Sequence, residues 1–217
     1  MENSKQRYMN DNFIKKTIKN ENRLFFERII NHIFINSANL NDLSLFHGKM
    51  GLIILFIHYS KYSRNSIYEE FAWELLDDVF NEINLDIPIN FEFGLCGIGW
   101  GIEYLLQNNY LEGDSNMILE NIDNKIMELN LDKIKDSSIR SGTKGILNYV
   151  FMRLRSHKQN KAKNPFDFLL NLVNNQSIYN LQDLFLELRE APNDDSFLKW
   201  NIGIDNGCAG YLLKKIL

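Results

Sequence analysis

The sequence predicts an all-α protein built from about four helical hairpins. Its apolar residues recur with helical periodicity, and sustained two-residue alternation with the β-branched enrichment of strands is missing. Only 3 prolines occur among 217 residues, so little interrupts the periodic segments. A short glycine-rich motif also recurs along the chain, and such repetition indicates stacked copies of one supersecondary unit.

The four motifs share a frame in which an aliphatic residue and two variable positions precede Gly-x-x-Gly and an apolar residue. They are residues 45–52 (LFHGKMGL), 95–102 (LCGIGWGI), 139–146 (IRSGTKGI) and 204–211 (IDNGCAGY). The positions that we take as equivalent are Gly48, Ile98, Gly142 and Gly207. They lie 50, 44 and 65 residues apart, and each interval has room for two helices. The second motif fits loosely, because an isoleucine replaces its first glycine.

An apolar stripe of helical period follows each motif, and these segments are the predicted inner helices. The outer helices are expected before and between the motifs, where local sequence signals mark their starts. They are residues 24–34, a helix that begins at a capping box of Ser66 and Glu69, a helix over 117–129 that begins at Asp114 or Ser115, a helix that begins at Asn164 and Pro165, and residues 180–189. We expect a single domain over residues 1–217, with a loosely ordered segment at 1–20.

The paired glycines have two interpretations. Two glycines three positions apart lie on one face of the first helical turn, where a neighbouring backbone can approach closely. Each glycine inside a helix costs about 1 kcal/mol relative to alanine, so a compensating role is expected. That role is either tight packing between inner helices or exposure of backbone N–H groups toward a ligand.

Composition narrows the function classes. A net charge of −4 and an isoelectric point near 5.6 argue against a nucleic-acid binder, which needs clustered cations. The one basic stretch, from Arg153 to Lys163, is interpreted as a solvated helix end and loop. The N-terminal residues lack the layout of a signal peptide, and the apolar runs are too short to span a bilayer. We therefore expect a cytoplasmic protein without a membrane partner, with Cys96 and Cys208 as reduced thiols.

The motifs resemble those of the lanthionine synthetase C-like (LanC-like) family, in which Gly-x-x-Gly motifs open the inner helices of an (α/α) toroid. The segments that carry the resemblance are residues 44–51 (SLFHGKMG), 93–99 (FGLCGIG) and 203–210 (GIDNGCAG). The resemblance implies a toroid-like arrangement of four hairpins, incomplete relative to the family's ring of about seven. Either the four units close on themselves in a smaller bundle, or a second copy, as in a homodimer, or another protein completes the arc.

The family's cyclases hold a zinc ion with two cysteines and a histidine. Zinc activates a peptide thiolate, which adds to a dehydrated Ser or Thr and closes a thioether ring. The ligand cysteines stand two positions before the first motif glycine, and a histidine follows one of them. The resemblance therefore implies Cys96 and His47 as zinc ligands and catalytic residues, although Phe46 replaces the cysteine before His47. Asp205, two positions before Gly207, is a candidate oxygen ligand and third catalytic residue.

Inner helices that run parallel gather their N-termini at one rim, where their dipoles favour an anionic or electron-rich ligand. We expect eight residues to face a common mouth there: His47, Lys49, Cys96, Trp100, Arg140, Lys144, Asp205 and Cys208. A thiol near helix N-termini has a lowered pKa, which makes Cys96 a candidate nucleophile. The alternative is that Cys96 is a small buried apolar side chain.

Two functional hypotheses follow. In the first, this is a LanC-like protein that acts in maturation of a ribosomally made peptide, by thioether formation at a thiol- or metal-assisted site. Its partners are then the peptide substrate or another modifying enzyme. In the second, it is a non-catalytic helical scaffold that binds a peptide or a partner protein at the rim. Whether the protein is an enzyme stays open at this point.

Overall fold

The computed structural model describes residues 22–157, 166 and 195–217, and these ranges contain helices and no strand. The predicted all-α class is therefore confirmed for the described part of the chain. No helix in that part combines the length and apolarity needed to cross a membrane. The predictions for residues 1–20 and 180–189, and for the helix starting at Asn164, fall outside the described residues.

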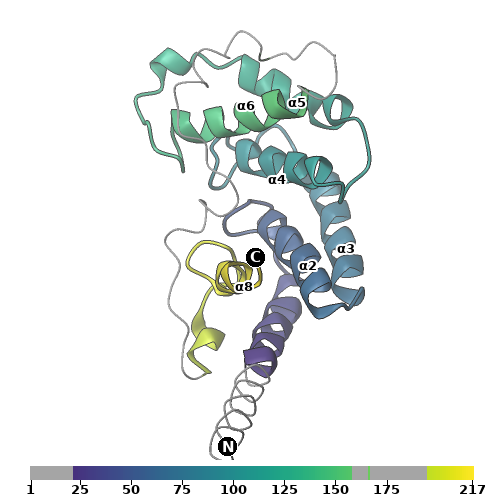
Figure 1. Cartoon of the computed structure of the whole chain (residues 1–217). Coiled ribbons are helices and arrows are strands. Elements are labelled where there is room, and N and C mark those ends of the chain that lie inside the picture. The colour runs from purple at the N-terminus through teal and green to yellow at the C-terminus, as the bar shows by residue number, and fades with distance from the viewer. Residues whose placement is uncertain (1–21, 158–165, 167–194) are drawn as a thin grey trace, which may run out of the picture.

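The inner helices follow the four motifs as predicted. They are α2 (Lys49–Ser63), α4 (Leu95–Gln107), α6 (Thr143–His157) and α8 (Cys208–Ile216). Helix α8 packs against α2, α2 against α4, and α4 against α6, so the helices succeed one another through the molecule (Figure 1). Every residue of α2 from Lys49 to Ile57 is buried, which fits a segment that is apolar on every side.

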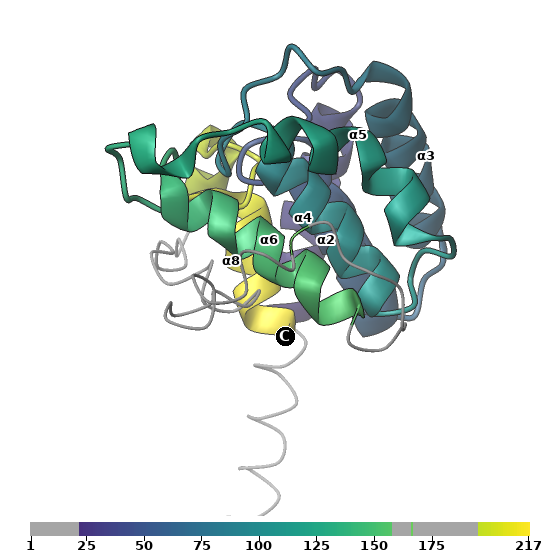
Figure 2. The same cartoon turned by 90° about the horizontal axis from the view of Figure 1, so that it is seen from above.

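The outer helices lie on the flanks of this row. The helix predicted at residues 24–34 extends over 22–37, and it is followed by α3 (Ile67–Glu82) and α5 (Ser115–Met127). Helix α5 lies beside α4 (Figure 2) and α3 beside α2 (Figure 1), which is the arrangement of two hairpins. Short 3-10 helices are present at Leu131–Lys133 and Asp195–Lys199.

Capping at the outer helices was predicted only in part. The side chain of Asp114 accepts a hydrogen bond from the Asn116 N–H, so Asp114 is the N-cap of α5. The predicted capping box of α3 is wrong, because Ser66 makes no side-chain cap bond. Instead, Asn65 Oδ1 accepts a hydrogen bond from the Ile67 N–H at 3.2 Å. The Asn65 carboxamide therefore caps the first turn in place of the Ser66 hydroxyl.

A single hydrogen-bond pattern identifies the repeats. The first N–H of each inner helix donates to the carbonyl seven residues earlier, at 2.7–2.9 Å. The donor and acceptor residues are Lys49 and Asp42, Leu95 and Pro88, Thr143 and Asp136, and Cys208 and Asn201. The residue before each donor is therefore the equivalent position: Gly48, Gly94, Gly142 and Gly207. The register predicted for the second motif is wrong, because Gly94 takes the place assigned to Ile98.

Glycine is required at these positions because of crowding. At Gly94 the backbone is extended, with φ −124° and ψ −171°, a conformation open to any residue. A Cβ there would nevertheless collide with the carbonyl oxygens of Pro88 and Asn90, and the same collision with the preceding turn recurs in the other repeats. Farther along α4, Gly99 touches the Tyr149 ring and Gly101 touches Met50. Around these glycines the structure supports the packing interpretation.

A buried charge network joins α4, α5 and α6. Arg153 is fully buried; it binds both carboxylate oxygens of Asp123, with Nη2 2.7 Å from Oδ2, and its Nη1 donates to Glu103 Oε2 at 2.7 Å. The Tyr149 hydroxyl donates to Asp123 Oδ1 at 2.5 Å. Arg153 was predicted to lie in a solvated basic stretch, and that prediction is wrong. Its neighbour Arg155 is the exposed one.

We expect Gly94→Ala to lower the free energy of unfolding by about 2–3 kcal/mol, in the upper range for single substitutions. The reason is that backbone atoms, rather than flexible side chains, stand in the way of the new methyl group. Urea denaturation followed by circular dichroism measures the change. The exposed Asn81→Ala on α3 is the control and should stay within about 0.5 kcal/mol of the wild type. An unchanged Gly94→Ala protein would contradict the register.

Replacing Arg153 should destabilise the fold much more than replacing Arg155. Arg153→Met leaves Asp123 and Glu103 buried without their cation, and removing one partner of a buried ion pair costs about 3–5 kcal/mol. Arg155→Met removes the same charge from an exposed position of the same helix. Equal urea midpoints for the two variants would show that the network contributes nothing.

Candidate functional site

Four side chains meet where the turns before the inner helices come together. Counting from the first motif glycine, position −2 is occupied by Glu92, Arg140 and Asp205 in the second, third and fourth repeats. In the first repeat, position −1 supplies His47. We call these four residues the mouth cluster. Glu92 and Arg140 lie 48 residues apart in the chain and Arg140 and Asp205 lie 65 apart, yet both pairs are in direct contact.

Backbone hydrogen bonds tie the turns together in pairs. The N–H groups of Phe91 and Glu92 both donate to the carbonyl of Arg140 at 3.0 Å. In the same way, the N–H groups of Ile204 and Asp205 donate to the carbonyl of Phe46, at 2.8 and 3.0 Å. The second repeat is thus joined to the third, and the fourth to the first. Within each pair the backbone is therefore fixed without help from the charged side chains, which link one pair of turns to the other.

Arg140 bridges the two carboxylates of the mouth cluster. Its Nη1 donates to Glu92 Oε1 at 2.6 Å and to Asp205 Oδ2 at 3.0 Å, and its Nη2 donates to Asp205 Oδ1 at 2.7 Å. The exposed side-chain fractions are 34% for Arg140, 15% for Glu92 and 19% for Asp205. Hydrogen bonding to Asp205 raises the pKa of Arg140, with Glu92 adding to the effect against partial burial. The guanidinium is therefore permanently charged.

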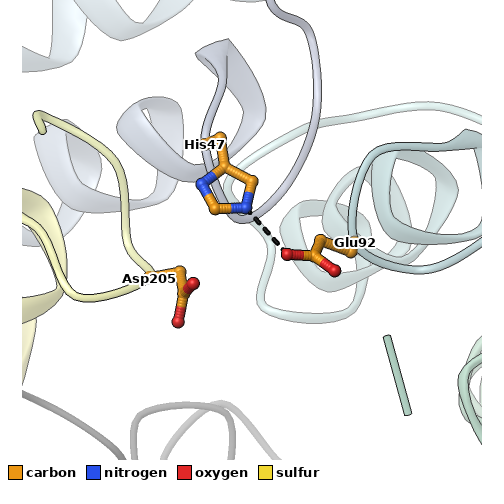
Figure 3. Close-up of side chains that lie close together, drawn as sticks. All are labelled: His47, Glu92 and Asp205. Carbon is orange, nitrogen blue, oxygen red and sulfur yellow. Dashed lines mark hydrogen bonds and ion pairs between the residues drawn. The ribbon is translucent and has the colours of Figure 1, made fainter. Parts of the chain in front are cut away.

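His47 completes the mouth cluster from the first repeat. Its Nε2 lies 3.0 Å from Glu92 Oε1, and Figure 3 shows the two side chains facing each other with Asp205 nearby. The imidazole stacks on the ring of Phe93, with 4.8 Å between the ring centroids. Phe93 is 51% exposed, so an aromatic surface borders the charged groups. The Arg140 guanidinium also lies 5.3 Å from the centre of the Phe46 ring.

The structure brings together three of the eight residues predicted at the mouth: His47, Arg140 and Asp205. Lys49 points to the outer helix instead, where its Nζ lies 2.9 Å from Asp78 and 3.0 Å from Glu82. Lys144 is exposed and is not among the interacting side chains of the mouth cluster. The prediction of a shared mouth therefore holds for residues that precede a motif glycine.

The other three predicted mouth residues belong to the core. Trp100 is buried and stacks on Tyr104, with ring centroids 5.6 Å apart. Cys208 is buried, and its Sγ lies 3.5 Å from the carbonyl oxygen of Phe197. Cys96 is fully buried as well. These side chains stabilise the helices that carry the mouth without facing it.

The proposed lowering of the Cys96 pKa is wrong. Burial removes the thiol from water and raises its pKa, because the thiolate is the charged form. In the corrected register Cys96 stands two positions after the first glycine of its motif, on the inward side of α4. The position two residues before that glycine, where the family resemblance places a ligand, holds Glu92. Aligning Gly94 and Gly97 with the other glycine pairs would have identified Glu92 from the sequence.

The geometry suits a metal ion in one respect and conflicts with it in another. One ligand atom each from His47, Glu92 and Asp205 lies within 4.8 Å of the others, close enough for the three to converge on an ion. However, both oxygens of Asp205 and Oε1 of Glu92 are already bonded to Arg140. A guanidinium between the carboxylates repels a second cation. The described residues therefore do not fit the zinc–thiolate centre that the family resemblance implies.

Neither cysteine should react with Ellman's reagent in the native protein at pH 8. Burial raises the pKa of Cys208 to about 11 and also that of Cys96, so both remain protonated thiols out of reach of the reagent. Two thiols should appear once guanidinium chloride unfolds the chain. Lys144→Cys is the control, because it places a thiol at the exposed position equivalent to Cys96 and should add one fast-reacting group. Rapid native labelling of Cys96 would contradict its burial.

Comparison with known proteins supports the repeat structure. The family model of lanthionine synthetase C-like proteins matches residues 39–212, which include all four motifs. No curated protein and no solved structure matches the chain significantly. The match spans most of the chain and agrees with the helical repeats described above. The chain therefore belongs to the lanthionine synthetase C-like family.

Proposed function

We propose that this chain takes part in maturation of a ribosomally made peptide by binding the peptide at the mouth cluster. In this proposal no peptide thiol is activated on a zinc ion held by this chain. The supporting observation is the set of residues at position −2, which are Glu92, Arg140 and Asp205 bound to one another. A site filled by its own ion pairs can hold a ligand through hydrogen bonds and apolar contacts, but it offers no thiolate.

The mouth cluster has the chemical variety that peptide binding requires. The partly exposed carboxylates of Glu92 and Asp205 can accept hydrogen bonds from peptide N–H groups, and Arg140 can donate to a peptide carbonyl or carboxylate. Phe93 offers an exposed ring on which an apolar or aromatic side chain can pack. The N-termini of the inner helices add partial positive charge on the same side.

Thioether formation with a metal is the second candidate. The observation in its favour is that His47, Glu92 and Asp205 bring three ligand atoms within 4.8 Å of each other. Against it stand the position of Arg140 between the carboxylates and the burial of Cys96. Stoichiometric zinc in protein purified without chelator, together with loss of a free thiol from a dehydrated peptide, would favour this candidate over the first.

Removal of the Phe93 ring should weaken peptide binding. The probe is a synthetic peptide that contains Ser, Thr and Cys, labelled with fluorescein and titrated with the protein while fluorescence anisotropy is measured. Phe93→Ala should raise the dissociation constant roughly threefold to tenfold, the size of one aromatic contact. Met117→Ala is the control, because Met117 is 76% exposed and lies on α5. Equal affinity for the two variants, or no binding by the wild type, would contradict the proposal.

A further inference from the structure

The guanidinium of Arg140 lies in the space that a metal ion would need. Its Nη1 is 2.6 Å from Glu92 Oε1 and 3.0 Å from Asp205 Oδ2, so one nitrogen stands between the two carboxylates. The second nitrogen holds the remaining oxygen of Asp205 at 2.7 Å. Both oxygens of Asp205 are thus bonded to a group with a permanent positive charge.

Without that guanidinium the remaining groups are close to a metal-binding geometry. Zinc bonds to nitrogen and oxygen are about 2.0–2.2 Å long, so two ligands of a tetrahedral ion lie roughly 3.4 Å apart. His47 Nε2 and Glu92 Oε1 are already 3.0 Å apart, and all three ligand atoms lie within 4.8 Å. A change of at most about 1.4 Å in the separation of the ligand atoms would complete the set, which rotation of the Asp205 side chain can supply.

The backbone that carries these ligands does not depend on the Arg140 side chain. Residue 140 holds the second repeat through its main-chain carbonyl, which accepts from the N–H groups of Phe91 and Glu92. Asp205 is held through its own N–H by the carbonyl of Phe46. A substitution at position 140 keeps these bonds, so the three ligands should stay in place when the guanidinium is removed.

We propose that Arg140 is the resident cation of a masked metal site formed by His47, Glu92 and Asp205. One imidazole and two carboxylates suit divalent ions such as Zn²⁺, Co²⁺ and Mn²⁺. With Arg140 present both carboxylates are already paired with a cation of the protein itself, and a divalent ion is excluded. Loss of the guanidinium leaves the two carboxylates without a counter-ion, and a metal ion then takes that role. This inference stands independently of peptide binding, so the two proposals can fail separately.

Isothermal titration with Zn²⁺ tests the inference. The wild type should show no saturable binding in the micromolar range. Arg140→Gln should bind one ion at least about 30-fold more tightly than the wild type, because removing one positive charge roughly 4 Å from a dication has an effect of this size even in water. Titration with Co²⁺ should give visible absorption bands in the variant alone. Circular dichroism establishes that each protein is folded.

Three further variants locate the effect. Arg155→Gln removes the same charge from an exposed site of α6 and should bind no more Zn²⁺ than the wild type. Arg140→Lys keeps the charge and should also remain without metal. Adding His47→Ala to Arg140→Gln should abolish the gain, because it removes the nitrogen ligand. Two results would overturn the inference. One is micromolar zinc binding by the wild type, a measurement that needs no variant. The other is a folded Arg140→Gln protein that binds zinc no more tightly than Arg155→Gln.

Discussion

The hydrogen bond between the first N–H of an inner helix and the carbonyl seven residues earlier is the constraint on which the described structure depends. It folds the preceding turn tightly onto the start of the helix, as with Leu95 and Pro88. No room is left for a side chain on the residue just before the helix, which is Gly94 in this repeat. Glycine follows as a steric requirement. The same turn then fixes where the residue at position −2 must lie, so one local interaction sets the direction of the functional side chains.

The chemistry of the mouth depends on which residues occupy position −2 of the turns. A thiolate there favours zinc, whereas Glu92, Arg140 and Asp205 satisfy one another. Their side chains are mostly buried, so the carboxylates would lose much of their hydration without the guanidinium, and pairing offsets that cost. The mouth thus combines glycine-marked turns with a closed set of ion pairs, and the exposed ring of Phe93, stacked on His47, borders it.

Arginines connect neighbouring repeats at two levels of the structure. Arg140 joins the turns at the mouth, while Arg153, on the following helix, binds Asp123 and Glu103 inside the helical layer. Lys49 acts similarly within one hairpin by joining α2 to Asp78 of α3. Each cation is bonded to carboxylates from other elements, and that pairing allows charged side chains to lie in buried or half-buried positions. Arg153 and Lys49 therefore join helices to one another, whereas Arg140 orders the side chains of the mouth cluster.

The sequence alone determined the all-helical class, the glycine-marked starts of three inner helices and the start of α5 at Asp114 or Ser115, because neighbouring residues decide these features. The register near Cys96 was predicted wrongly because glycines are crowded there, and the bond from Leu95 to Pro88 shows that Gly94 is the equivalent position. Tertiary structure alone decided that Cys96 is buried and that Glu92 meets residues far along the chain. Such contacts depend on how helices pack against each other, and local sequence patterns carry no record of that packing.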